Sequence, residues 1–428
     1  MSGWGMATAT HPPVQEQSSW KSRLSALGPG LLMASAAIGG SHLVSSTQAG
    51  ALYQWQLVGL VLFALLMKYP FFRFGAQYTA ETGESLVQGY ARKGRVTLWV
   101  FFVFCAVSSV ISAAGVGILC AVILKFALPT SWGLSVPWVA ALMMASVWLI
   151  LLAGRFPVLD KLTKLIITIL TVVTVVTVIV AASKGAQGAA DAVAPSPWTL
   201  VALPFLVALI GWMPAPIEIS ALQSLWIAEK QRFRPANARD VIFDFNVGYV
   251  ISAILAVFFI ALGALVQFGT GTQIQSAGGA YIPQLITMYT NTMGEWARPL
   301  MALLAFVVMY GTTIAVVDGY GRACAESMHL IRRGEGGAGR QAVMVWSTGI
   351  ALVALGIIVW FSAQMGELLR FAMVAAFIMA PIFAWLNFQL VRRQDHLSNT
   401  LRILAWVGLA FLGGFTLLFL AAELGLIG

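Results

Sequence analysis

Residues 28–42 read GPGLLMASAAIGGSH, and the apolar run continues to Gly50. A segment of this length can cross a lipid bilayer, because about 20 apolar residues in a helix span its hydrocarbon core. Two glycines, a serine and a histidine at 39–42 fall near the middle of the run. Glycine and serine are poor helix formers, so we predict that the helix unwinds there. Unwound backbone at membrane depth must be buried by protein or wetted by water, which makes the break a candidate binding site.

A second apolar run, at 203–226, is interrupted in the same way. Its residues 211–218 read GWMPAPIE. Pro214 and Pro216 lack the amide hydrogen that a helix needs, and Ala215 is driven out of the helical region by the proline after it. Two interrupted spans in corresponding halves of a chain point to the binding site of a secondary transporter.

The composition indicates a membrane protein. Of 428 residues, 59% are hydrophobic and 10% are charged, and the mean hydropathy is +0.86. These values exclude an ordinary soluble domain. We expect residues 1–27 to be a disordered cytoplasmic tail and residues 28–428 to be a single transmembrane domain. The three cysteines are scattered, so neither a disulfide framework nor a thiolate metal cage is expected.

Eleven apolar runs are long enough to cross a membrane, which predicts an all-α protein of about eleven transmembrane helices. We expect a repeat at about 28–183, a second at about 198–390 and a peripheral helix at about 401–424. The runs lie at about 28–50, 55–79, 97–126, 136–153, 162–183, 198–226, 241–268, 296–320, 342–362, 367–390 and 401–424. Between them, 79–95 predicts a short interfacial helix and 269–283 a solvated outer loop.

The basic residues alternate between loops and so predict the topology. With the amino terminus in the cytoplasm, all but four of the 25 Lys and Arg residues fall on the inner side, Lys68 and Arg73 among them. The positive-inside rule favours this orientation, in a bacterial inner membrane. The net charge of +9 therefore reflects topology, and we expect the lipid bilayer as a partner but no nucleic acid.

The chain resembles the Nramp (natural resistance-associated macrophage protein) family of divalent-metal transporters. The resemblance rests on Gly28-Pro29-Gly30, the spacing to the first break, residues 48–50 (QAG), residues 81–86 (ETGESL), and Met213-Pro214. It implies a leucine-transporter-type 5+5 inverted repeat, with broken first and sixth helices, and alternating access. The Asp of the family's first-helix motif falls on Gly39 and its Asn on His42, while the sixth-helix His becomes Ala215. We therefore interpret the chain as a divergent branch that lacks the family's binding carboxylate.

The two breaks supply the candidate metal ligands. His42 offers a nitrogen and Met213 a thioether, a pair that suits late first-row transition metals. Backbone carbonyls near Gly39 and Gly211 can add oxygen ligands. For His42 the alternative is a neutral histidine that is hydrogen-bonded inside the bundle, and for Met213 it is packing. The polar tenth-helix position of the family falls near Met373, which is otherwise core filler.

Glu218 is the most informative carboxylate, because acidic groups at membrane depth are costly and usually functional. It can serve as a counter-charge or proton carrier, or it can cap the second half-helix. Asp318 is a second candidate, and its alternative is an ion pair with Arg322 one helical turn away. Thr47 and Gln48 are predicted to line an inner pathway, and Asp244 to be an inner-gate or interfacial residue.

These observations predict a secondary active transporter of a divalent metal cation, with proton coupling as an option. No Gly-x-Ser-x-Gly, His-Glu-x-x-His or phosphate-binding Gly-x-x-x-x-Gly-Lys pattern occurs in the sequence, so we expect no enzyme, no cofactor and no ATP-driven step. Two alternatives stay open: a carrier of a small organic solute on the same fold, and a non-transporting sensor.

Overall fold

The computed structural model describes residues 27–427, apart from 154–155, 234, 276–277 and 393–396. The tail predicted at 1–27 therefore lies outside the described residues, except for Leu27. Every regular element within the described ranges is a helix, which confirms the all-α prediction.

Nine helices in the described part of the chain are long and apolar enough to cross a membrane. Together with the two interrupted segments they account for the eleven runs found in the sequence. They are α4 (Val58–Thr82), α6 (Arg95–Ala127), α7 (Val136–Ala153), α8 (Phe156–Lys184), α11 (Ala238–Val266), α13 (Ala297–Arg333), α14 (Arg340–Trp360), α15 (Met365–Val391) and α16 (Asn399–Glu423).

The first interrupted segment consists of three short pieces. Helix α2 (Pro29–Ala37) ends at Ile38, whose φ of −80° and ψ of 81° are not helical. A π-helical turn, η1 (Ser41–Ser46), follows and leads directly into α3 (Thr47–Tyr53). The predicted break is therefore confirmed, but the chain resumes a wide helical turn at Ser41 instead of staying unwound through His42.

The second interrupted segment has a longer gap. Helix α9 (Leu203–Gly211) and helix α10 (Ile219–Phe233) are separated by residues 212–218. The peptide bond between Met213 and Pro214 is cis. The two prolines thus end the helix where the sequence predicted.

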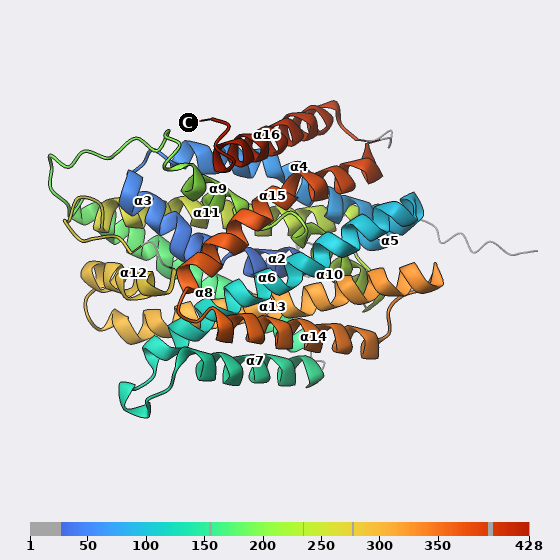
Figure 1. Ribbon diagram of the computed structural model, residues 1–428, viewed down its shortest axis with the longest axis horizontal. Helices are drawn as coiled ribbons and strands as arrows, with labels where there is room; N and C mark the ends of the chain where they lie inside the picture. The colour runs from blue at the N-terminus through green and yellow to red at the C-terminus, as the bar shows by residue number, and fades with distance from the viewer. Residues whose placement is uncertain (1–26, 154–155, 234, 276–277, 393–396, 428) are drawn as a thin grey trace, which may run out of the picture.

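The long helices run side by side along the long axis of the molecule, with α2 near the centre and α7 and α16 at opposite edges (Figure 1). Helix α6 packs extensively against α13, and α11 packs against α2, α3 and α4. Helix α5 and the amino-terminal end of the described chain lie at one end of the bundle, which we call the α5 end. Helix α12 and the connection between α6 and α7, which contains η2 (Thr130–Trp132), lie at the other, the α12 end.

Two of the segments that connect the long helices contain short helices of their own. Helix α5 (Leu86–Lys93) corresponds to the predicted interfacial helix, and its apolar side chains, such as Val87 and Tyr90, are buried against α6 and α13. Helix α12 (Gly278–Met293) begins inside the segment 269–283. The expectation of a loop throughout that segment is therefore wrong, because the apolar residues after Gly279 pack on the bundle.

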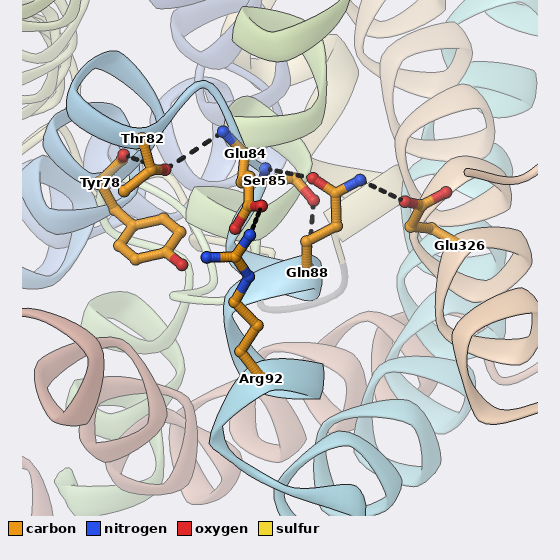
Figure 2. A network of polar contacts seen from close by, with 7 residues as sticks. All are labelled: Tyr78, Thr82, Glu84, Ser85, Gln88, Arg92 and Glu326. Carbon is orange, nitrogen blue, oxygen red and sulfur yellow. Dashed lines mark hydrogen bonds and ion pairs between the residues drawn. The ribbon is translucent and has the colours of Figure 1, made fainter. Parts of the chain in front are cut away.

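The turn between α4 and α5 is held by a polar network (Figure 2). Gly83 ends α4 with a φ of 74°, and Ser85 begins α5 with a reciprocal capping box to Gln88. The Gln88 amide donates to Glu326 on α13 at 3.1 Å, and Arg92 pairs with Glu84. Residues 81–86, which carry part of the family resemblance, thus connect α4 to α5, and the Gln88–Glu326 hydrogen bond joins α5 to α13.

Helix α11 approaches both halves of the first interrupted segment so closely that only glycine fits. A Cβ atom on Gly248 would lie 2.1 Å from the Gly30 carbonyl oxygen, and one on Gly263 would lie 2.1 Å from the Thr47 carbonyl oxygen. The backbones of α2, α3 and α11 are therefore in direct contact.

We expect Gly248→Ala to lower the free energy of unfolding by about 1–3 kcal/mol, because the added methyl group forces α2 and α11 apart. Thermal unfolding of the detergent-solubilised protein measures the change. The matched control is Gly349→Ala on α14, where a Cβ atom meets nothing within 4 Å and helix propensity alone predicts a small gain. Equal stability of the two variants would contradict the close approach.

Candidate functional site

The two breaks meet around one cavity of about 20 Å³. The first break contributes Gly39, Gly40 and Ser41, and the second contributes Trp212, Ala215 and Pro216. Helices α6 and α13 close the wall, with Ser112, Val116, Thr312, Val316 and Tyr320. A cavity of roughly 10–15 Å³ is the least that holds one water molecule, so this one holds a water molecule or a single ion.

The Thr312 hydroxyl on α13 lies against carbonyl groups that the first break leaves free, and it is also 3.1 Å from the Val308 carbonyl of its own helix. The hydroxyl lies 2.8 Å from the Ser35 carbonyl oxygen and 3.4 Å from that of Ile38. A Cβ atom on Gly39 would lie 3.2 Å from the Thr312 side chain, so Gly39 leaves room for this contact. Gly39 therefore lies at the cavity wall.

His42 points away from the cavity, toward α11. Its Nε2 atom donates to the Ser252 carbonyl oxygen at 3.0 Å, and its Nδ1 atom lies 2.8 Å from the Ser41 hydroxyl. Both ring nitrogens are engaged, so neither is open to a metal in this conformation. The structure thus differs from the predicted ligand role and matches the geometry of the hydrogen-bonded alternative.

Met213 and Met373 are buried, but neither is among the residues that line the cavity. Met373 accepts a hydrogen bond from the Ser45 hydroxyl at 3.3 Å. Its carbonyl oxygen would lie 2.2 Å from a Cβ atom on Gly211, so α9 and α15 touch at that glycine. Both methionines pack beside the breaks in this conformation, and the thioether ligand role of Met213 stays a prediction.

The sequence analysis missed Lys68, which lies within α4 and is 0% exposed. Its ammonium group donates to the carbonyl oxygens of Ile210 at 2.6 Å, Gly211 at 2.9 Å and Ala215 at 3.4 Å. The Gly211 carbonyl predicted as a metal ligand is therefore bound to a lysine. Counting Lys68 as an inner-loop residue was wrong, because it sits inside a membrane-spanning helix, as does Arg73. The sequence does contain a signal for this residue, because Lys68 is a basic residue inside the span predicted at about 55–79, and charged residues at membrane depth usually have a function.

Glu218 lies directly before α10 and is 1% exposed. One carboxylate oxygen accepts hydrogen bonds from Ser108 on α6 and from Tyr320 on α13, the latter at 2.9 Å. The other oxygen has no hydrogen-bond partner among the described residues. Glu218 thus links the second break to the two longest helices of the wall.

The other predicted residues lie outside the cavity. Asp318 pairs with Arg322 at 2.8 Å and accepts from the Trp226 indole at 3.1 Å, which is the ion-pair alternative. Thr47 bonds to carbonyls of its own helical turn. Gln48 donates to the Gln275 carbonyl oxygen, in the connection between α11 and α12. Gln48 therefore contacts the connection at the α12 end of the bundle, and the predicted role of Thr47 and Gln48 in an inner pathway stays a prediction.

Asp244 on α11 holds the start of α2. Its two carboxylate oxygens accept from the backbone amides of Gly28 at 2.9 Å and Gly30 at 2.7 Å. Lys230 on α10 donates to the Leu27 carbonyl oxygen at 2.9 Å. The α5 end of the first segment is thus bonded to α10 and α11, and the inner-gate or interfacial role of Asp244 stays a prediction.

Within the described ranges, no three His, Cys, Asp or Glu side chains lie close enough together to hold a metal ion. The cavity wall offers hydroxyl groups, an indole ring and the carbonyls of the breaks. Most of the lining is apolar, and the polar side-chain groups are the hydroxyl groups of Ser41, Ser112, Thr312 and Tyr320 and the Trp212 indole.

The whole chain is similar to known transporters in fold. An Eremococcus coleocola manganese transporter shares 15% identity with a TM-score of 0.73, over 96% of this chain and 89% of that chain. MhsT in complex with L-phenylalanine (12% identity, 95% of this chain, 100% of that chain) and a nucleobase-cation-symport-1 family transporter with bound bromovinylhydantoin (14%, 96% of this chain, 95% of that chain) have TM-scores of 0.60 and 0.59. These similarities show the leucine-transporter-type fold with its broken first and sixth helices.

The sequence comparisons agree with the fold. An uncharacterized protein of Pasteurella multocida (strain Pm70) is 50% identical over 414 residues, which are 96% of this chain and 95% of that protein. The natural resistance-associated macrophage protein-like (Nramp) family matches residues 30–422. This chain is therefore a multi-pass integral membrane protein that belongs to the Nramp family.

Proposed function

We propose that the protein is a secondary active transporter that moves a divalent metal cation across the membrane by alternating access. The observation that carries the proposal is the single cavity enclosed by both broken helices. Membership of the Nramp family supports it, as does the similarity in fold to a manganese transporter. The cavity size favours an ion in this conformation, because about 20 Å³ leaves no room for an organic solute.

We place the cation beside Gly39, Ser41, Ala215 and Thr312. These residues line the cavity, and Ser41 and Thr312 offer hydroxyl oxygens, which are hard ligands. The proposal also includes the bacterial inner membrane, a cytoplasmic amino terminus, and repeats at about 28–183 and 198–390. The inner orientation is supported by the basic residues in and beside the connections at the α5 end, such as Arg92, Lys93 and Arg340.

A carrier of a small organic solute is the second candidate, and one observation favours it. The residues that line the cavity include neither a carboxylate nor a thioether, whereas the Trp212 ring and several aliphatic groups are present. A divalent metal usually retains at least one anionic ligand. The assay below therefore includes both classes of substrate.

We expect purified protein in proteoliposomes to take up Mn²⁺ saturably, and Val116→Trp to reduce uptake at least about tenfold, because an indole fills the cavity between the breaks. Uptake of ⁵⁴Mn²⁺ is measured in competition with Fe²⁺, Zn²⁺, Mg²⁺ and a mixture of amino acids. The control is Val107→Trp on the same helix, which is 50% exposed on the outer face of the bundle.

Three outcomes separate the candidates. Saturable Mn²⁺ uptake that is blocked by Val116→Trp supports the metal carrier. Uptake of an amino acid without Mn²⁺ uptake supports the organic-solute carrier. No counterflow of any solute contradicts both and indicates a sensor.

We also propose proton coupling through Glu218, because a buried carboxylate with one unpartnered oxygen among the described residues can hold a proton between the two half-helices. We expect Glu218→Gln to remove the stimulation of uptake by an inward proton gradient while retaining exchange without a gradient. The control is Glu367→Gln at the start of α15, and full stimulation of Glu218→Gln would contradict the role.

A further inference from the structure

The ammonium group of Lys68 is surrounded by oxygen atoms at the second break, in an arrangement that usually binds a metal ion. Three backbone carbonyl oxygens, from Ile210, Gly211 and Ala215, surround the Lys68 Nζ atom at 2.6–3.4 Å. An ammonium group has three hydrogen-bond donors, so each donor meets one carbonyl. The entire side chain is buried, with 0% exposure.

The carbonyls converge because the helix ends there. The last carbonyls of α9 have no i→i+4 partner within the helix, although the Ile210 carbonyl also accepts from the backbone amide of Met213 at 3.3 Å. This end carries the negative pole of the helix dipole. Ala215 adds a third oxygen from beyond the cis Met213–Pro214 bond. The break thus builds a pocket of oxygen atoms that requires a positive charge.

The charge balance around this pocket selects a single positive charge. Glu218, directly before α10, lies three residues after Ala215, whose carbonyl oxygen Lys68 contacts, and it is as deeply buried as Lys68. One carboxylate neutralises one monovalent cation, whereas a divalent ion in the same place would leave an uncompensated buried charge, which is costly.

We propose that the break between α9 and α10 contains a second cation site, formed by the carbonyl oxygens of Ile210, Gly211 and Ala215, which the ammonium group of Lys68 fills as a tethered monovalent cation. The site lies beside the cavity, with which it shares Ala215, and it goes beyond the proposed substrate site. The protein therefore carries the cation that stabilises its second break, and it needs no Na⁺ or K⁺ there.

Thermal stability tests this proposal independently of transport. We expect the melting temperature of the wild-type protein in detergent to stay within about 1 °C when NaCl, KCl or choline chloride is exchanged at constant ionic strength. We expect Lys68→Met to be less stable in choline chloride and to be stabilised by NaCl or KCl, by on the order of 5 °C at a salt concentration about 100 times the dissociation constant.

Two controls accompany this variant. Lys184→Met removes a lysine that also donates to a carbonyl, that of Thr292 at 2.6 Å, but at the exposed end of α8. It is expected to show no difference between salts. The double variant Lys68→Met with Glu218→Gln removes the balancing carboxylate and is expected to lose the stabilisation by Na⁺ or K⁺.

If Lys68→Met does not fold, a second variant, Lys68→Ala, tests the same proposal. Lys68→Ala leaves space for the missing propylammonium group, and we expect n-propylammonium to raise its melting temperature whereas n-propanol does not. Cation-independent stability of Lys68→Met, a wild-type protein that requires Na⁺ or K⁺, or equal effects of the amine and the alcohol would each overturn the proposal. None of these results depends on which solute is transported, so the failure of either proposal can be recognised separately.

Discussion

An interrupted helix in a bilayer has backbone groups that no lipid can satisfy, and in this protein side chains from neighbouring helices satisfy them. Thr312 on α13 bonds to the carbonyls before the first break. Lys68 on α4 bonds to the carbonyls at the second, and Asp244 on α11 accepts from the amides at the start of α2. Lys68 is a cation at the carboxyl-terminal end of α9, which is the negative end of the helix dipole, and Asp244 is an anion at the positive, amino-terminal end of α2. The breaks are possible because three different helices provide these partners.

The same contacts join the elements that line the cavity. Glu218 connects the second break to Ser108 on α6 and to Tyr320 on α13, and these two helices pack along much of their length. Thr312 lies two helical turns before Tyr320 on α13 and bonds to the first break. Both breaks are therefore bonded to one helix, α13.

Glycine, proline and hydropathy predicted most of the fold. Pro214 and Pro216 fixed the end of α9, and most of the apolar runs fell within a few residues of the observed helices, although α13 continues 13 residues beyond the run that we predicted to end at about 320. The direction of His42 could not be predicted, because a π-helical turn holds more residues per turn than an α-helix and so rotates every later side chain. Lys68 was overlooked because the charge count treated every lysine as a loop residue, although Lys68 stands in the middle of a predicted span. Its three carbonyl partners lie about 140 residues away in sequence, beyond the reach of any local pattern.

The close contacts of α11 restrict how the first span can move. Gly248 meets the backbone of α2, Gly263 meets that of α3, and Ser252 between them accepts a hydrogen bond from His42. Helix α11 is therefore in contact with the first span before, at and after the interruption. A bend at Ile38 that moved one half alone would shear at least one of these contacts. We therefore expect movement of the first span to be coupled to movement of α11.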